Sequence, residues 1–434
     1  MEKIRELIMS ESFKNTYRSN VKDFSRTCIV TFSMLIVFII NLAKRSLQID
    51  LNKFIKRIGL PRISKQLFSI ARRKIMPSAF IRLTKELIHE FYHDNVFPTF
   101  LGFRIVVVDG STVQLPEGAL IREKYGFCGN AEKSDLMSMA RMSSAYDPLS
   151  GVTLDAIMSP YVASERSMAF DHILNIEPSN SASDLYLFDR GYPSITLIFF
   201  LLHHKKEFLI RCSETSWLSE ITKLVNLNKK DTIIEICPKI LKGKKRQNFQ
   251  ERLPNTCLKS TVKVRVLIIN LPNGKREILV TSLLDKKAYN YEIFQGLYHL
   301  RWGGEENYKF HKVRIEIENF SGSLPCAIEQ DFHASIFTGN VKALIAGEAQ
   351  EELEMESLKK KNKHCYKINQ NIAIGILKDE LIDVLLNPKV DLKSFCEETK
   401  NEMKKNTESI RPGRSYERIR KTNRKYPMNM RRAF

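Results

Sequence analysis

Three acidic residues occur where a carboxylate could take part in chemistry, and two of them follow apolar runs. Asp109 lies at the end of VVVDG and Asp189 at the end of YLFDRG, so each follows a predicted strand at the start of a turn. Taken singly, each could be an ordinary turn-forming aspartate. In an open α/β sheet, ligand sites lie beyond the carboxyl ends of neighbouring strands, so the two carboxylates could meet there.

The third acidic residue, Glu305, lies in the stretch YHLRWGGEENYKFHK, residues 298–312. On a regular helix of about 100° per residue, it shares one narrow face with Tyr298, Arg301 and Lys312. Such a face suits an active site in which the glutamate binds a metal, the cations bind phosphate and the tyrosine positions them. The alternative is a solvated helix whose charged residues pair three or four positions apart.

Glu306 lies about 100° from that face on a regular helix, so Glu305 is the predicted ligand. Three carboxylates within about 4 Å repel one another by about 4 kcal/mol per pair at an effective dielectric near 20. Bound cations are therefore expected, and oxygen ligands suit Mg²⁺, with Mn²⁺ as the substitute. Two such ions activate a water or a 3′-hydroxyl and stabilise the leaving oxygen in phosphodiester chemistry. The sequence thus predicts a two-metal site on Asp109, Asp189 and Glu305.

The chain is strongly basic, with 69 Lys and Arg against 49 Asp and Glu, a formal net charge of +20 and a pI near 9.5. Nucleic acid is the first candidate partner for such a charge, and an anionic membrane surface is the second. The tail 403–434 is almost purely basic and is expected to contact DNA. A metal-binding carboxylate site in a basic protein indicates a metal-dependent nuclease or strand transferase.

Hydrophobic periodicity divides the chain into regions of different character. Residues 1–95 are helical and basic in pattern, and are predicted to form an N-terminal DNA-binding domain. From 96 to 350, short apolar strands alternate with helices, which predicts an α/β catalytic domain. Within it, residues 213–283 are β-rich, and the Asn-Gly of LPNGKRE predicts a hairpin. Residues 351–434 are predicted to be helical and basic.

The cysteines and the longest apolar run exclude other classes of protein. Eight cysteines are scattered without a CxxC pair, so neither a zinc module nor a disulfide framework is expected. Residues 28–43 form a run of sixteen without charge, shorter than the roughly 20 that a bilayer span needs. They are predicted to form a buried core helix that continues through residues 44–59. We therefore expect no membrane partner and a cytoplasmic, nucleoid-associated protein.

Several motifs together resemble one family. Tyr298, Arg301, Glu305 and Lys312 are separated by two, three and six residues, and this spacing resembles the signature of DDE transposases of bacterial insertion sequences, specifically the insertion-sequence-four family. VVVDGS and LYLFDRGYPS are similar to the regions around that family's first and second catalytic aspartates. The pairs RW and EE and the segment ENFSG match the surroundings of its glutamate. The resemblance extends from about residue 20 to residue 350.

The resemblance implies an RNase H-like core, interrupted by the β-rich insertion between Asp189 and Glu305. It implies that these two residues and Asp109 are catalytic and hold two Mg²⁺ ions. The implied partner is double-stranded DNA, both the element's terminal repeats and the target, bound by a homodimer. Arg190, in DRGYP, is either a phosphate contact or an ordinary surface arginine. Trp217 either stacks on a flipped nucleotide, as an aromatic residue does in some family members, or packs in a core.

Two glycines stand beside the predicted ligand Glu305. Gly303 and Gly304 cost about 1 kcal/mol each in a helix interior, which indicates that something approaches the backbone closely. The family usually has a bulky apolar residue at the position of Gly304, so looser packing of the catalytic helix is also expected there.

The sequence therefore predicts a transposase that cuts DNA at the ends of an insertion sequence by water attack and joins the freed 3′-hydroxyl to a target. A hairpin intermediate is implied by the resemblance alone. The alternatives are an RNase H-like nuclease without strand transfer and a catalytically decayed copy that only binds DNA. A membrane-surface protein is the least favoured class.

Overall fold

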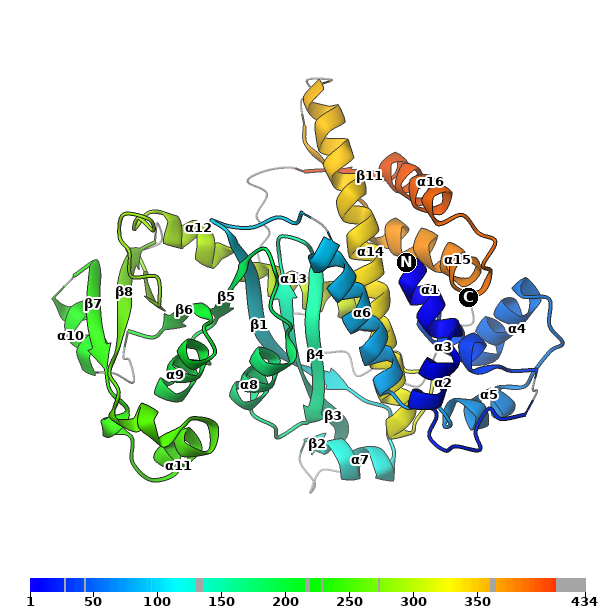
Figure 1. Ribbon diagram of the computed structural model, residues 1–434, viewed down its shortest axis with the longest axis horizontal. Coiled ribbons are helices and arrows are strands. Elements are labelled where there is room, and N and C mark those ends of the chain that lie inside the picture. The colour runs from blue at the N-terminus through cyan, green and yellow to red at the C-terminus, as the bar shows by residue number, and fades with distance from the viewer. Residues whose placement is uncertain are drawn as a thin grey trace.

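A mixed β-sheet forms the centre of the protein, and helices pack on both of its faces (Figure 1). The computed structural model describes residues 1–26, 29–42, 44–94, 96–129, 136–214, 219–227, 229–271, 274–359 and 364–410. Within these ranges the main sheet has nine strands in the order β2-β3-β1-β5-β6-β9-β8-β7, with β4 paired to β3. The predicted α/β class is confirmed.

The strand β1 (Phe103–Gln114) lies in the interior of this sheet and carries Asp109. It pairs antiparallel with β3 (Met137–Asp147) and parallel with β5 (Ser183–Phe188). Val107 is in register with Leu187, so Asp109 on β1 and Asp189, directly after β5, follow at equivalent positions. The shared direction of β1 and β5 therefore brings the two aspartates to the same edge of the sheet. The turn predicted at Asp109 is wrong, because β1 continues to Gln114 by pairing with β3.

Strands from the predicted β-rich region extend the same sheet. β6 (Glu207–Cys212) pairs parallel with β5 and antiparallel with β9 (Arg276–Thr281). The predicted hairpin is confirmed, because β9 pairs antiparallel with β8 (Val262–Asn270) and Gly274 has a left-handed φ of +77°. The remaining elements of the region are β7 (Asp231–Ile236), α10 (Ser219–Asn226), η2 (Pro238–Ile240), α11 (Gly243–Arg252) and η3 (Asn255–Lys259).

Alternate residues of β1 face two different helical layers. Val106 and Val108 belong to a core with α8 (Glu165–Asn175) and α9 (Ile195–His203). Ile105 and Val107 belong to a core with α12 (Ile293–His299) on the other face. Because side chains alternate along a strand, Asp109 points to the face of Val107. On the far side of β1, β3 also pairs with β4 (Val152–Pro160) and β2 (Phe127–Cys128). The helix α7 (Ala119–Tyr125) precedes β2.

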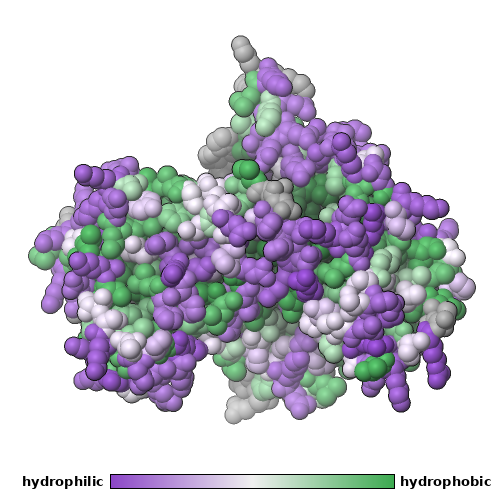
Figure 2. Space-filling model, viewed as in Figure 1, coloured by the Kyte–Doolittle hydropathy of each residue, from purple (hydrophilic) through white to green (hydrophobic). Residues whose placement is uncertain are grey.

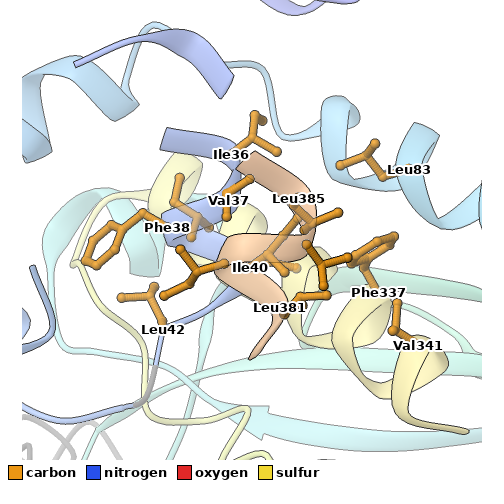
Figure 3. Close-up of a cluster of buried hydrophobic side chains, with 14 of the residues drawn as sticks. Ile36, Val37, Phe38, Ile40, Leu42, Leu83, Phe337, Val341, Leu381 and Leu385 are labelled. Atoms are coloured by element: carbon orange, nitrogen blue, oxygen red, sulfur yellow. The ribbon is translucent and has the colours of Figure 1, made fainter. Parts of the chain in front are cut away.

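A helical body lies beside the sheet, and both ends of the described chain contribute to it. Its elements are α1 (Glu2–Met9), α2 (Glu11–Tyr17), α3 (Phe32–Ile40), α4 (Leu47–Arg57), α5 (Lys65–Arg72), α6 (Ser78–Asp94), α14 (Pro325–Lys359), α15 (Gln370–Leu386) and α16 (Leu392–Lys405). Ile36 and Ile40 of α3 pack in one core with Phe337 of α14 and Leu381 and Leu385 of α15 (Figure 3). The helical pattern predicted for residues 1–95 is present, and the boundaries drawn at 95 and 350 stay predictions.

Most of the described apolar run is buried as predicted, although Ile29 is exposed, and the run does not form one long helix. α3 begins after Thr31, whose hydroxyl caps the helix by accepting a hydrogen bond from Met34 N, and it ends at Ile40. Lys44 has a left-handed φ of 64°, and α4 begins only at Leu47. The predicted continuous helix is therefore wrong, because the chain turns between two shorter helices. No helix among the described residues is long and apolar enough to cross a membrane.

The C-terminal end of the described chain is a short β-pair. β10 (Tyr366–Ile368) pairs antiparallel with β11 (Thr407–Ser409). The basic tail continues beyond residue 410, and there it lies outside the described residues, as does Trp217. The predictions made for the tail and for Trp217 therefore stay predictions.

Candidate active site

Asp109 lies on β1 where side chains from both faces of the sheet converge. Its carboxylate Oδ1 accepts a hydrogen bond from Gly110 N at 2.9 Å. Its main-chain oxygen accepts hydrogen bonds from Ser143 Oγ at 3.0 Å and from Tyr308 OH at 2.5 Å. Two side chains on different elements thus fix the backbone that carries this carboxylate.

The pKa of Asp109 is raised to about 6. Burial is the main cause, and the negative charges of Asp189 and Glu305 raise the pKa further, whereas the Gly110 N–H and the Arg301 charge oppose the shift. The three predicted carboxylates therefore lie near enough to repel one another. Repulsion of this kind is what a bound cation would relieve.

Asp189 lies directly after β5 in a tight turn. Its Oδ1 accepts a hydrogen bond from Gly191 N at 2.7 Å. A Cβ on Gly191 would lie only 2.9 Å from that oxygen, so a larger residue at this position would displace the Asp189 carboxylate. Arg190 between them is exposed and forms no hydrogen bond or ion pair with a described residue, so the structure leaves it free for a ligand.

The stretch 298–312 is not the single regular helix that the sequence predicted. α12 ends at His299, and α13 (Trp302–Lys309) begins after two residues that bond three positions back, with Leu300 N to Leu297 O at 3.2 Å and Arg301 N to Tyr298 O at 3.1 Å. A π-helical turn, Phe310–Arg314, then follows α13. The prediction of one narrow face is therefore wrong, because the helix changes its winding twice.

Arg301 nevertheless joins two of the predicted ligands. Its Nη2 lies 2.8 Å from Glu305 Oε1, and its Nη1 lies 3.8 Å from Asp109 Oδ2. The guanidinium also lies 5.9 Å from the ring centroid of Tyr298. Arg301 is only 7% exposed, so this positive charge is held between the carboxylates largely out of water.

Lys312 lies apart from this group, within the π-helical turn. Its Nζ donates hydrogen bonds to Ser111 Oγ at 2.9 Å and Thr112 O at 2.6 Å. Burial lowers its pKa, and Glu318 partly offsets that shift. Lys312 therefore contacts β1 just beyond Asp109, and these hydrogen bonds do not involve Glu305.

The two glutamates of the stretch have different surroundings. Glu305 is held by Arg301, whereas Glu306 is exposed and pairs with Lys309 at 3.3 Å. Glu306 therefore fits the alternative of a solvated helix face with surface ion pairs, whereas Glu305 does not.

Both glycines before Glu305 are required by close packing. A Cβ on Gly303 would lie 2.6 Å from Pro148 Cβ, and a Cβ on Gly304 would lie 2.8 Å from Val107 Cγ1. The close approach expected from the sequence is present, and the neighbour is the protein itself. The expectation that Gly304 loosens the helix is wrong, because α13 lies directly on β1 there.

Several residues that the sequence analysis did not select surround Asp109. His172 Nε2 lies 2.9 Å from Ser143 Oγ, and His172 Nδ1 lies 2.7 Å from Asp155 Oδ2. Because Ser143 bonds Asp109, a buried chain of hydrogen bonds runs from β4 through α8 and β3 to the main chain of β1. Tyr308, three residues after Glu305, was the only one with a sequence signal, since it lies in the same motif.

A cation beside Asp189 was also missed. Phe188 is in register with Ile210, so Arg211 follows on β6 as the neighbour of Asp189. Its Nε lies 3.5 Å from Glu277 Oε1 on β9. The sequence could not show this pairing, because it depends on how β6 and β9 lie in the sheet.

The carboxylate oxygens at this edge of the sheet are ligands that suit a hard metal ion, although they do not lie close enough together to surround one. Among the described residues, no group of three or more His, Cys, Asp or Glu is close enough to hold a metal. Asp109, Asp189 and Glu305 supply only oxygen ligands, the kind that Mg²⁺ prefers. Arg301 supplies the positive charge between two of them.

This combination of sheet and carboxylates agrees with the family comparison. A family model described as "Transposase DDE domain" matches residues 101–336, more than half of the chain. The protein therefore belongs to the DDE transposases. The region matched contains all of the predicted catalytic residues and the strands β1 and β5 that position the two aspartates.

Among solved structures, the chain is similar to a piggyBac transposase in a synaptic complex with hairpin DNA. The sequence identity is 11% and the TM-score is 0.45, over 95% of this chain and 86% of that one. The search of curated proteins gave no match.

Proposed function

We propose that this DDE transposase is of the insertion-sequence-four type, and that it cuts DNA at the ends of its element and joins the freed 3′-hydroxyl to target DNA. The observation that carries the proposal is the position of Arg301, which contacts Glu305 and lies 3.8 Å from Asp109. The Tyr-Arg-Glu-Lys spacing supports it.

In this proposal, β1, β3, β4, β5 and β6 form an RNase H-like core, and residues 213–283 are its β-rich insertion. Residues 1–95 form the N-terminal DNA-binding domain, and residues 351–434 form the helical and basic C-terminal region. The position of Asp109 and Asp189 on adjacent parallel strands supports the assignment of the core, because two catalytic carboxylates must share one edge.

Asp109, Asp189 and Glu305 would hold the metal, with two Mg²⁺ ions proposed and Mn²⁺ as the substitute. Such ions, when bound, lower the pKa of an attacking water or hydroxyl and stabilise the leaving oxygen. Arg301, Lys312 and Arg190 would bind phosphate oxygens, and Tyr298 would support Arg301 through the face of its ring. Since Arg301 pairs with Glu305 here, it would exchange that carboxylate for phosphate when the site is loaded.

The partner proposed is double-stranded DNA, both terminal repeats and target, bound by a homodimer at the nucleoid. The net charge of +20 supports a polyanionic partner. Hydrophilic side chains cover much of the face shown in Figure 2, including the part formed by α11. The exposed residues Lys242, Lys244, Lys245 and Arg246 supply a positive charge there.

Strand transfer distinguishes this proposal from a nuclease. Full-length protein is incubated with Mg²⁺, a pre-cut terminal repeat that carries a free 3′-hydroxyl, and a labelled target plasmid. Joined products support the transposase. Cleavage of uncut ends without joining favours the nuclease alternative, and end binding without cleavage or joining favours a decayed copy.

A further inference from the structure

A cavity of about 380 Å³ lies behind the helix that carries Glu305. It is bordered by α13 and the π-helical turn, by the β3–β4 turn, by α14 and by the start of α15. Glu306 and Lys309 line it, so it opens on the opposite side of α13 from Arg301. No residue of the proposed catalytic group lines this cavity.

A buried lysine that pairs with no described carboxylate lines the cavity. Lys342 is 8% exposed. Its Nζ donates a hydrogen bond to Gln370 Oε1 at 2.6 Å and lies 4.0 Å from the centroid of the Phe310 ring. Neither partner is charged, and no carboxylate in the described part of the chain pairs with this lysine. Burial accordingly lowers the pKa of Lys342 to about 8.

The other charges around the cavity do not compensate Lys342. Glu306 pairs with Lys309 at 3.3 Å, and Glu408 lies 3.9 Å from Lys367. Arg314, which also lines the cavity, is exposed and has no ion pair with a described residue. The described part of the chain therefore supplies no anion for Lys342 or Arg314.

A neutral histidine adds an unsatisfied polar group. His311 lines the cavity, is 2% exposed, and its Nδ1 has no hydrogen-bond partner among the described residues. Burial, with a smaller effect of Lys342, lowers the pKa of His311 to about 3, so the ring adds no charge. A buried ammonium and an unpaired ring nitrogen are costly unless a ligand satisfies them.

We propose that this cavity binds the phosphate group of a nucleotide, with Lys342 and Arg314 as its cationic ligands. A phosphate supplies two negative charges and several acceptor oxygens, which matches the two unpaired cations. The site goes beyond the proposed function, because it shares no residue with the carboxylate edge.

The size and lining of the cavity favour a nucleotide over a free phosphate ion. At about 30 Å³ per water, the space holds roughly a dozen waters, far more than one phosphate displaces, and it falls within the range of ligand pockets. Tyr146 and Phe310 supply aromatic surface in the same cavity. Base stacking on aromatic rings stabilises nucleotide binding with little dependence on sequence.

The test is isothermal titration calorimetry of the full-length protein in a chelating buffer, so that neither metal nor cleavage contributes. The probes are deoxyadenosine monophosphate, deoxyadenosine and inorganic phosphate. The nucleotide is expected to bind, and deoxyadenosine to bind at least about tenfold more weakly, because the phosphate makes the charge-assisted hydrogen bonds. Equal binding of deoxyadenosine and its monophosphate would overturn the proposal.

Two variants locate the binding. Lys342→Met keeps the aliphatic packing on Phe310 and removes a buried charge, and Arg314→Gln changes an exposed side chain, so both should fold. Each is expected to lower the affinity for deoxyadenosine monophosphate at least about tenfold. Wild-type affinity in both variants, or no nucleotide binding by the wild type, would refute the site.

Lys378→Met is the matched control. Lys378 is half-buried, desolvation lowers its pKa to about 7, and its Nζ donates to Leu42 O at 2.6 Å. It does not line the cavity, so its removal should leave nucleotide affinity unchanged. An equal loss in the Lys342 and Lys378 variants would mean that the cavity is not the site.

A competition arm identifies the source of the phosphate. Single-stranded DNA without terminal phosphates is added to protein that is saturated with labelled deoxyadenosine monophosphate. Displacement assigns the site to a phosphodiester of a DNA strand, and retention of the label assigns it to a free nucleotide.

Discussion

The hydroxyl of Tyr308 lies 2.5 Å from the main-chain oxygen of Asp109. Tyr308 follows Glu305 by three residues on α13, so one hydrogen bond ties the helix of one proposed ligand to the strand of another. Such a contact holds the spacing of the two carboxylates independently of Arg301.

Tyr308→Phe should therefore impair chemistry more than binding. The variant loses one hydrogen bond, worth about 1 kcal/mol, and α13 becomes freer to shift on β1. We expect cleavage of labelled element ends to fall roughly tenfold, because small displacements of aligned groups are costly, with unchanged affinity for those ends. A gel-based cleavage assay and a binding titration measure the two quantities.

Tyr192→Phe serves as its control. Tyr192 is also buried, and its hydroxyl has no hydrogen-bond partner among the described residues. Removing that oxygen should therefore leave cleavage close to wild type. Equal losses in the two variants would mean that the Asp109 contact has no special role.

Asp109→Asn should raise the stability of the metal-free protein at neutral pH. The pKa of Asp109 is about 6 when folded, above its ordinary 3.8, because of burial and the neighbouring carboxylates. The folded state thus favours the protonated form, so ionisation of Asp109 destabilises the fold increasingly from about pH 4 and in full above about pH 6. We expect a gain on the order of 1 to 3 kcal/mol at neutral pH, which should shrink as the pH falls from about 6 to about 4.

Thermal unfolding with and without Mg²⁺ measures this effect. Added Mg²⁺ should raise the melting temperature of the wild type and not that of Asp109→Asn, because a ligand stabilises only the state that binds it. Asp171→Asn, at an exposed position of α8, should change neither response. Equal Mg²⁺ stabilisation of wild type and Asp109→Asn would remove Asp109 from the metal site.

Ser143→Ala tests the buried chain of hydrogen bonds behind Asp109. The variant leaves His172 Nε2 without its partner and removes one donor from the Asp109 main-chain oxygen. We expect a loss of stability of about 1 to 3 kcal/mol and, in addition, a higher Mg²⁺ concentration for half-maximal cleavage.

Thr281→Val provides the comparison. Thr281 is also buried in the main sheet, and its Oγ1 donates to Phe208 O at 2.6 Å, a bond of the same kind away from Asp109. It should lose similar stability with no shift in the Mg²⁺ requirement. If both variants required more Mg²⁺ for half-maximal cleavage, the effect of Ser143→Ala would be only a consequence of lower stability.

The sequence predicted the sheet edge better than the helix that faces it. Asp109 and Asp189 each end an apolar run, and parallel pairing of β1 and β5 then places them together. The changes of winding in residues 298–314 could not be predicted from spacing, and neither could the close packing of Gly303 on Pro148 and of Gly304 on Val107. A projection that assumes a regular helix of about 100° per residue takes no account of such tertiary contacts.

The support behind Asp109 was equally inaccessible to sequence reasoning. Ser143, His172 and Asp155 come from three elements and have no motif spacing, and their contacts exist only because α8 packs on β3 and β4. Tyr308 was within reach, since it lies in the same motif as Glu305. The sequence pattern thus contained the proposed ligands, whereas the residues that hold them in place required the fold.

Removing residues 411–434 should weaken the salt dependence of DNA binding. β11 ends at Ser409, so this truncation keeps the β10–β11 pair and all of α16. Each phosphate contact contributes about 0.9 to the slope of log affinity against log salt, so the basic tail should account for part of that slope. Binding titrations at several salt concentrations measure it. The same slope with and without the tail would show that the tail does not touch DNA.

Glu305→Gln should separate DNA binding from chemistry. Glutamine keeps the size of the side chain and its contact with Arg301, but loses the charge that would hold a metal. We expect unchanged binding of the terminal repeat and loss of both hydrolysis and strand transfer with Mg²⁺ present. Glu306→Gln is the internal control, because Glu306 is exposed and pairs only with Lys309 at the surface, so it should retain most activity. One gel with end-labelled DNA compares both variants with the wild type. Cleavage by Glu305→Gln at the wild-type level would exclude Glu305 as a metal ligand. Loss of cleavage in Glu306→Gln alone would assign the metal-binding role to Glu306.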